Sequence, residues 1–181
     1  ADLTFTTLIE PTVTTGTSSS ITSTSATAGG DVTSDGGSAI TERGVVYGLS
    51  SNPTTAGSKV STSGTTGTYT VSLTGLSNGT LYHYRAYAIN SVGTSYGSDS
   101  VFTTDSIAPT VTTSTITSIT STGASSGGNV TDAGGGTISE RGVVYSTSSN
   151  PTTADTKVID GAATTGSFSS SLTGLSQGTT Y

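Results

Sequence analysis

The residue best suited to acid–base chemistry is His83, the single histidine of the sequence. Hydrolysis by a side-chain nucleophile needs a nucleophile, a base and an orienting acid in contact. Serine is abundant, but no Gly-x-Ser-x-Gly elbow stands ahead of a helix. His83 shares one face of a predicted strand with Arg85, so we expect a solvated cross-strand residue. The sequence predicts no catalytic residue, no cofactor and no enzymatic activity.

Glycoside cleavage by paired carboxylates would need two suitably placed acids among eleven scattered ones. Glu42 and Glu140 occupy equivalent places in two similar stretches, which indicates a structural role rather than one active site. Arg43 and Arg141 follow them directly. Neighbours along a strand point to opposite faces, so each arginine is expected to meet an adjacent strand or an aromatic ring instead of its own glutamate.

Four oxygen-bearing residues lie in or beside two equivalent turns: Asp31, Asp35, Asn129 and Asp132. Calcium prefers six to eight oxygen ligands, commonly several carboxylates from one loop. Two such residues for each turn are a weak signal, and no Asp-x-Asp-x-Asp-Gly loop occurs. The sequence therefore predicts no metal site.

The composition argues against several classes of partner. Only five residues are Lys or Arg and the formal net charge is −6, whereas nucleic-acid binding needs clustered positive charge. No stretch approaches the 18 apolar residues of a membrane span, so membrane insertion is not expected. Hydrophobic residues make up 30% and cysteine is absent, but abundant Thr, Val, Ile and Tyr favour pleated strands.

The sequence repeats itself at a spacing of 98 residues. Pro-Thr-Val-Thr-Thr at 11–15 returns at 109–113, and Glu-Arg-Gly-Val-Val-Tyr at 42–47 returns at 140–145. After a one-residue insertion, Leu-Thr-Gly-Leu at 73–76 matches 172–175. A unit of this length suits one β-sandwich.

Within a repeat the side chains alternate with period two, which is typical of strands with one buried face. Tyr69, Val71 and Leu73 alternate with Ser and Thr, and a longer run places Tyr82 and Tyr84 on one face. Val-rich 44–47 is expected to be covered on both faces. Gly-rich turns separate these runs. The predicted fold class is all-β, with tandem sandwiches and no helix.

Three segments follow from this frame. Residues 1–10 are predicted to form a strand resembling the last strand of a preceding repeat, because Phe5-Thr6-Thr7 matches Phe102-Thr103-Thr104. Residues 11–108 form the first repeat and residues 109–181 the second, which lacks its last two strands. An incomplete sheet exposes edges that recruit strands.

One hypothesis is that residues 1–10 of one subunit, through Leu3, Phe5 and Leu8, add as a strand to the incomplete second repeat of another subunit, giving head-to-tail filaments. The added segment replaces at most the last of the two missing strands. The alternative is that the sequence is an excerpt of a longer array.

The run from Leu76 to Asn90 resembles the end of a fibronectin type III domain, and 29–33 and 42–47 resemble the fibronectin III-like repeats of bacterial surface and secreted proteins. The resemblance implies an immunoglobulin-like sandwich in which Tyr82, and Tyr181 in the second repeat, form a tyrosine corner. It departs from the family in lacking the tryptophan of the second strand. Ser170 also replaces the core residue Val71, which thins the second core.

The resemblance implies an extracellular structural or adhesive role for the chain, as part of a cell-surface protein or of a filament. The expected partners are neighbouring copies or repeats, and surface glycans. The alternative is a spacer or carbohydrate-binding module of a secreted polysaccharide-degrading enzyme. Sugar platforms use exposed aromatic side chains, and Tyr87 and Tyr96 are the candidates for glycan contact.

Overall fold

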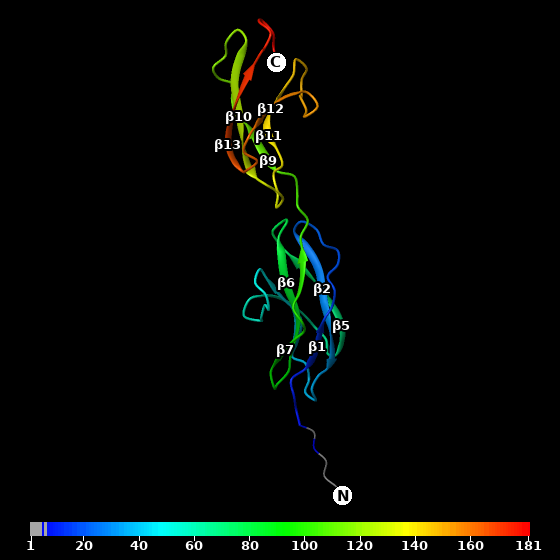
Figure 1. The fold of residues 1–181 in the computed structure, drawn as a ribbon. Coiled ribbons are helices and arrows are strands. Elements are labelled where there is room, and N and C mark those ends of the chain that lie inside the picture. Colours follow the sequence, from blue (N-terminus) through cyan, green and yellow to red (C-terminus); the bar gives the residue numbers. More distant parts are fainter. Residues whose placement is uncertain (1–4, 6) are drawn as a thin grey trace. The chain divides into compact units, whose positions relative to one another are not determined.

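The computed structural model describes residue 5 and residues 7–181, and every regular element in this part of the chain is a β-strand (Figure 1). The all-β fold class is confirmed. No helix that could cross a membrane is present among the described residues. The chain divides into two compact units, which we call unit 1 (Ala1–Ser106) and unit 2 (Ile107–Tyr181).

Unit 1 has two antiparallel sheets that enclose one apolar core. One sheet has the order β1-β2-β5, and the other has the order β4-β3-β6-β7, with β8 also paired to β6. The strands are β1 (Thr12–Thr15), β2 (Ser25–Ser34), β3 (Glu42–Gly48), β4 (Ser58–Thr62), β5 (Gly67–Thr74), β6 (Leu81–Ile89), β7 (Thr94–Tyr96) and β8 (Ser100–Thr103). The arrangement is sandwich-like.

The period-two pattern places the core as predicted. In β5, Tyr69, Val71 and Leu73 are buried while the residues between them are exposed, because successive side chains of a strand point to opposite faces. Val45 and Val46 of β3 are both fully buried. One contributes to the core between the sheets, and the other is covered on the outer face.

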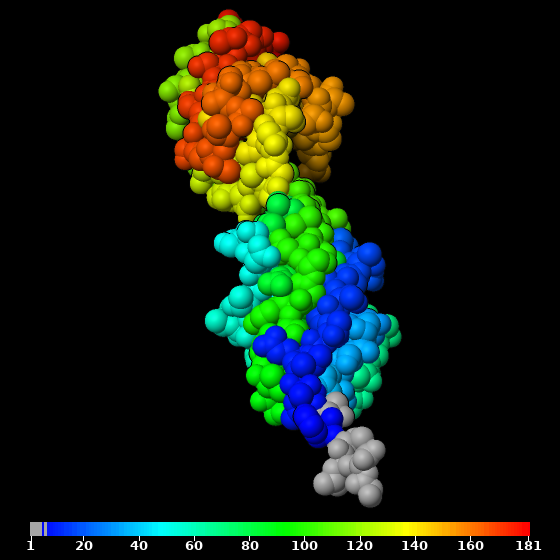
Figure 2. All heavy atoms as spheres, turned by 60° about the horizontal axis from the view of Figure 1, so that its bottom comes forward, coloured from blue at the N-terminus to red at the C-terminus, as the bar shows by residue number. Residues whose placement is uncertain are grey.

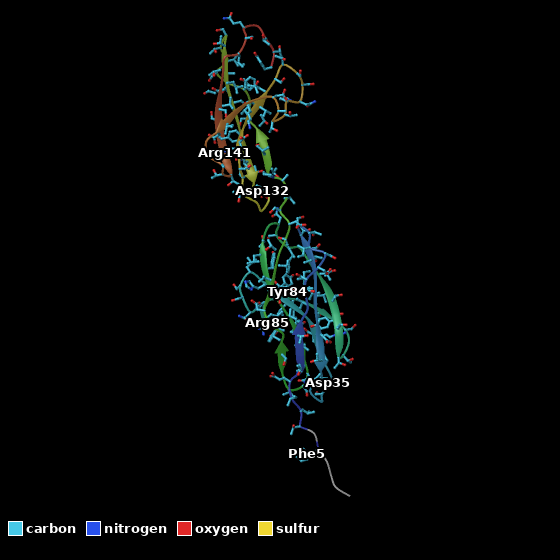
Figure 3. All side chains as sticks on the ribbon, turned by 45° about the vertical axis from the view of Figure 1, so that its right-hand side comes forward. Phe5, Asp35, Tyr84, Arg85, Asp132 and Arg141 are labelled. Atoms are coloured by element: carbon cyan, nitrogen blue, oxygen red, sulfur yellow. The ribbon has the colours of Figure 1, made fainter. Side chains whose placement is uncertain are left out.

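Side chains also tie the two sheets of unit 1 together. Tyr84 lies between them (Figure 3), and its hydroxyl donates a hydrogen bond of 2.9 Å to the carbonyl of Gly16. Thr15 of β1 accepts from the amide of Ala86 at 3.1 Å and donates to the carbonyl of Ser98 at 2.7 Å. The space-filling view shows the blue β1 segment against the green segment around β7 (Figure 2). The sandwich is thereby closed along this edge.

Unit 2 has five strands in two smaller sheets, of order β13-β10-β9 and β11-β12. They are β9 (Thr110–Thr113), β10 (Gly123–Asp132), β11 (Arg141–Tyr145), β12 (Thr156–Asp160) and β13 (Gly166–Thr173). Their order follows that of β1 to β5. Within residues 107–181, no strand lies on the side of β11 that β6 occupies beside β3. Val143 and Val144 are therefore only half-buried.

Candidate functional site

The most elaborate polar site in unit 1 is built around Arg43. Its guanidinium donates to the carbonyls of Ser63 (3.2 Å) and Thr65 (2.7 Å), in the loop between β4 and β5, and to that of Gly67 (3.1 Å), the first residue of β5. The same group lies 4.7 Å from the centroid of the Tyr69 ring. Arg43 thus meets a tyrosine face, one of the two partners expected from the sequence, and it fixes the loop.

Unit 2 repeats this arrangement. Arg141 donates to the carbonyl of Thr164 at 2.8 Å and lies 5.2 Å from the centroid of the Phe168 ring. It also forms an ion pair of 2.6 Å with Asp160. Sequence reasoning did not identify the loop carbonyls as the main partners, because they come from residues more than twenty positions further along the chain.

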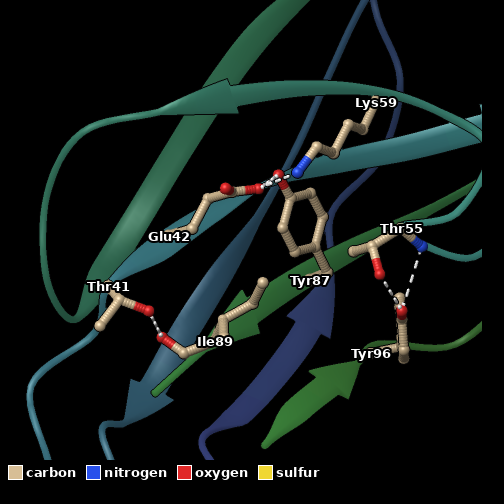
Figure 4. A network of polar contacts seen from close by, with 7 residues as sticks. All are labelled: Thr41, Glu42, Thr55, Lys59, Tyr87, Ile89 and Tyr96. Carbon is tan, nitrogen blue, oxygen red and sulfur yellow. Dashed lines mark hydrogen bonds and ion pairs between the residues drawn. The ribbon is translucent and has the colours of Figure 1, made fainter. Parts of the chain in front are cut away.

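The two recurrent glutamates pair with lysines on the neighbouring strand. Lys59 contacts Glu42 at 2.6 Å, and Lys157 contacts Glu140 at 2.7 Å. Tyr87 also donates to Glu42 at 2.5 Å (Figure 4). The hydrogen bonds from Lys59 and Tyr87 lower the pKa of Glu42. These glutamates therefore hold the outer face of the sheet together.

The structure places Tyr87 where it cannot act as a sugar platform. Its side chain is fully buried, because the ring lies over Gly44, whose missing Cβ would stand 3.0 Å from a ring carbon. Burial and the hydrogen bond to Glu42 raise the pKa of Tyr87. We therefore withdraw Tyr87 as a candidate glycan contact.

Tyr96, the other candidate, is half-buried, and both its hydroxyl and its ring have partners within unit 1. Its hydroxyl accepts from the Thr55 amide at 3.1 Å (Figure 4), and the Arg85 guanidinium lies 4.7 Å from its ring centroid. The hydrogen bond attaches the loop after β3 to β7, and the contact with Arg85 joins β7 to β6.

His83 has a structural partner that sequence reasoning missed. Its Nδ1 lies 2.7 Å from a carboxylate oxygen of Asp99, whose other oxygen accepts from the backbone amide of Asn52 at 3.2 Å. The pair therefore joins β6 to the loop after β3. Because Asp99 is sixteen residues from His83, spacing alone gave no signal for the contact.

Of the four residues weighed as metal ligands, Asp31 and Asn129 lie within β2 and β10 and not in turns, whereas Asp35 and Asp132 stabilise turns. Asp35 accepts from the amide of Gly37 at 2.9 Å, and Asp132 accepts from the amide of Gly134 at 2.7 Å. Such contacts between an Asp and the residue two positions on are common in turns. Among residues 5 and 7–181, no three His, Asp or Glu side chains cluster as a metal site would require.

Tyr82 and Tyr181 make the same contact in the two units. The hydroxyl of Tyr82 accepts from the Ser77 amide at 3.0 Å, and that of Tyr181 accepts from the Ser176 amide at 3.0 Å. The geometry is that of a tyrosine corner. Each corner loop fits the Gly-x-Ser-x-Gly spacing, a match overlooked in the sequence, but in unit 1 it precedes a strand rather than a helix.

The candidate donor residues have different positions. Leu3 lies outside the described residues. Phe5 is 90% exposed (Figure 3), and Leu8 is 51% exposed. The carbonyl of Ile9, in contrast, accepts from the buried side chain of Asn90 at 2.7 Å. Residues 5 and 7–10 contain no assigned strand, and the chain is anchored to unit 1 from Ile9 onward.

Several hollows open on unit 2. One, of about 470 Å³, lies beside Tyr181 and is lined by apolar side chains, among them Leu172 and Leu175, together with Ser and Thr residues. Another, of about 270 Å³, lies between the two small sheets and is lined by Val130, Val144 and Phe168 among others. Ser170 is buried nearby on β13, and its hydroxyl has no hydrogen-bond partner. Sequence reasoning foresaw the thinner core at Ser170 but not the hollows.

Comparisons with known proteins give little beyond the fold class. No family model and no curated protein matches the chain. Among solved structures, one similar chain is the solution structure of the sensor domain of an anti-sigma factor from Pseudobacteroides cellulosolvens. It is 24% identical, with a TM-score of 0.39, over 52% of this chain and 75% of the other.

Proposed function

We propose that the chain is part of an extracellular structural or adhesive repeat protein, built from tandem fibronectin III-like sandwiches. The observation that carries the proposal is the role of the side chains that recur between the units. Arg43 and Arg141 hold loop carbonyls, and Tyr82 and Tyr181 hold corner loops. The recurrent polar residues therefore maintain the shape of each unit, as expected of spacer modules that transmit force or set distance.

The strand order of unit 1 supports the fibronectin III-like part of this proposal. The first, second and fifth strands share one sheet, and the third, fourth, sixth and later strands share the other. This division between the sheets, together with the tyrosine corner, is characteristic of immunoglobulin-like sandwiches. Fold alone does not define a role, so the recurrent contacts remain the main argument.

The outer faces suit an extracellular surface rich in hydroxyl groups. In β5, Thr68, Thr70 and Ser72 are exposed while their neighbours are buried. The alternative role as a carbohydrate-binding module depended on Tyr87 and Tyr96. Burial of the first and the engagement of the second leave it without a supporting residue, so we do not propose it.

Antibodies raised against the 181-residue chain test the location and role. On intact cells of the source organism we expect surface labelling, and electron microscopy should show the label on extended material outside the envelope. Antibody against a cytoplasmic protein is the control for intact envelopes. Labelling that needs permeabilised cells would contradict the proposal.

A further inference from the structure

We propose that the hollow beside Tyr181 in one copy receives the segment 1–7 of a second copy, with the Phe5 ring inside the hollow. The inference rests on the proposed structural function and names the partner for assembly. It starts from unit 1, where Phe102 of β8 fills the equivalent place. Phe102 is 4% exposed, and its ring stacks on Tyr82 with centroids 5.6 Å apart.

Five lining residues of the hollow are counterparts of residues in the core cluster of unit 1 to which Phe102 belongs, or of residues packed against it. In unit 1 the same core contains Ala26, Leu73, Leu76 and Tyr82, with Ile21 packed against it. Their counterparts, 98 or 99 positions later, all line the hollow in unit 2: Ala124, Leu172, Leu175, Tyr181 and Ile119. Tyr181 is 45% exposed where Tyr82 is 8% exposed. The hollow is thus lined by counterparts of the core around Tyr82, the ring on which Phe102 stacks in unit 1.

The backbone around the hollow offers hydrogen bonds for an added strand. In unit 1 the Thr104 amide donates to the Thr80 carbonyl at 3.1 Å, and its hydroxyl donates to the Ser77 carbonyl at 2.6 Å. The Thr80 amide donates back to that hydroxyl at 2.9 Å. Ser176 and Thr179 are the counterparts of Ser77 and Thr80, so unit 2 carries the groups that a threonine at this position requires.

The segment 1–7 has the sequence that fits. Ala-Asp-Leu-Thr-Phe-Thr-Thr at 1–7 aligns with Ser-Asp-Ser-Val-Phe-Thr-Thr at 98–104, and the Asp, the Phe and both final Thr residues are identical. Phe5 takes the place of Phe102, and Thr7 takes the place of Thr104. Both are exposed in their own copy. Strand addition of this kind combines main-chain hydrogen bonds with a side chain in a pocket.

The docked segment pairs with the last residues of unit 2. β8 pairs with the beginning of β6, with Phe102 opposite Tyr82 and Thr103 opposite Leu81. Thr180 and Tyr181 are the counterparts of Leu81 and Tyr82, so residues 107–181 hold the partners for these two pairs of the β8–β6 register. Because segment 1–7 and the hollow are different surfaces, each copy can act as donor to one neighbour and acceptor to another, which builds an open head-to-tail chain.

Cysteine cross-linking tests the register. The native sequence contains no cysteine, so a Thr6→Cys copy mixed with a Thr180→Cys copy can form one mixed disulfide, which mass spectrometry distinguishes from the symmetric disulfides of like copies. These positions correspond to Thr103 and Leu81, which are opposite each other on neighbouring strands, at a separation that a disulfide can span. We expect a disulfide-linked heterodimer. Thr164→Cys, on an exposed loop of unit 2, is the acceptor control, and equal cross-linking to it overturns the proposal.

Sedimentation velocity of the full chain tests the role of Phe5. Concentration-dependent association should weaken at least tenfold in Phe5→Ala, since a buried phenylalanine is lost. Leu8→Ala is the matched control, because Leu8 aligns with no core residue, and its effect should stay below twofold. Equal effects, or a wild-type monomer at all concentrations, overturn the inference. If the antibodies label the cell surface but the chain is a monomer, the proposed function stands and the docking inference fails. If the chain associates but the antibodies do not label intact cells, the docking inference stands and the proposed function fails.

Discussion

The segment Glu-Arg-Gly-Val-Val-Tyr occurs in both units, but its surroundings differ. In unit 1, Gly44 is covered by the ring of Tyr87, and Val45 and Val46 are fully buried. In unit 2, Gly142 is exposed and the two valines are half-buried. The difference arises from β6, which pairs with β3 in unit 1. Burial of this strand is therefore determined by its neighbour and not by its own residues.

The loop contacts, in contrast, are similar in the two units, although β6 pairs with β3 in unit 1 only and Arg141 has an additional ion pair with Asp160. Arg43 and Arg141 bind equivalent loops, and each lies over an aromatic ring, Tyr69 or Phe168. The corner hydrogen bonds of Tyr82 and Tyr181 have equal lengths. The local contacts therefore form both in unit 1, which contains β6 to β8, and in unit 2, where residues 107–181 contain no counterpart of these strands. The burial of the core, in contrast, differs between the two units. Substitutions at paired positions can measure how much stability the closed core adds.

The largest effect is expected from the buried leucines. Leu73 is fully buried and Leu172 is 4% exposed, but Leu172 borders the hollow. Leu73→Ala should lower the free energy of unfolding of unit 1 by about 4 kcal/mol, and Leu172→Ala that of unit 2 by about 2 kcal/mol, because fewer packing contacts are lost beside an open space. Urea unfolding followed by the NMR amide signals of each unit measures both.

The control for this comparison is Leu81→Ala, at a position that is 50% exposed on β6. Its effect should stay within about 0.5 kcal/mol. Equal losses for Leu73→Ala and Leu172→Ala would show that the packing around Leu172 within residues 107–181 is as tight as that around Leu73.

Arg43→Met should lower the stability of unit 1 by about 3 kcal/mol, because several partly buried carbonyls lose their donor. The methionine keeps an apolar stem of similar length, so lost packing contributes little. Arg85→Met is the control, since Arg85 donates to one carbonyl, that of Gly97, at 2.8 Å. A loss for Arg85→Met as large as that for Arg43→Met would refute a special role of the loop contacts. The same urea experiment gives both values.

Much of the fold could be predicted because its signal is local. Alternation in 69–73 and 82–88 gave the buried faces, and the valines of β3 were expected to be covered on both sides. The covering of Tyr87 could not be predicted in this way. The burial of Tyr87 depends on Gly44, which lies directly opposite it on β3 and leaves room for the ring. The register between two strands that are distant in the sequence cannot be predicted from either segment alone.

The polar sites show the same limit. The recurrence of Glu42 and Arg43 indicated a structural role, and the contacts of both residues agree with it. The partners of Arg43 are backbone carbonyl groups, and because every residue has one, the sequence does not show which of them the arginine binds. The role of Asn90, whose side chain donates to Ile9 and to Asp35 at 2.8 Å, was missed for this reason. For a side chain that binds main-chain groups, the residue type can therefore indicate a structural role, but the sequence does not identify the main-chain groups that it binds.

Alkaline pH should separate the two units. Burial raises the pKa of Tyr69 to about 12, whereas an unfolded tyrosine loses its proton near pH 10. The stabilisation is therefore fully present below pH 10 and is lost as the pH rises from 10 to 12, by about 2 kcal/mol. Unit 2 carries Phe168 at this position, which has no proton to lose. Stability measured from pH 8 to 12 should fall more steeply for unit 1.

Tyr69→Phe is the matched variant for this titration. It removes the hydrogen bond of 2.8 Å to the Gly44 carbonyl, so unit 1 becomes less stable at pH 8, but its decline between pH 10 and 12 should become shallower. An unchanged decline would assign the alkaline effect to other tyrosines.

The smallest effect is expected in the core of unit 2 itself, and it has the opposite sign. Ser170 pairs with Ser126 across β13 and β10, where unit 1 pairs Val71 with Ala28. Because the buried hydroxyl of Ser170 has no partner, Ser170→Val should stabilise unit 2 by about 1 kcal/mol. Ser169→Val, on the exposed face of the same strand, should change little. A loss of stability in Ser170→Val would mean that the serine is not simply a weaker version of Val71, and that the space beside Ser126 does not accept the two methyl groups of valine.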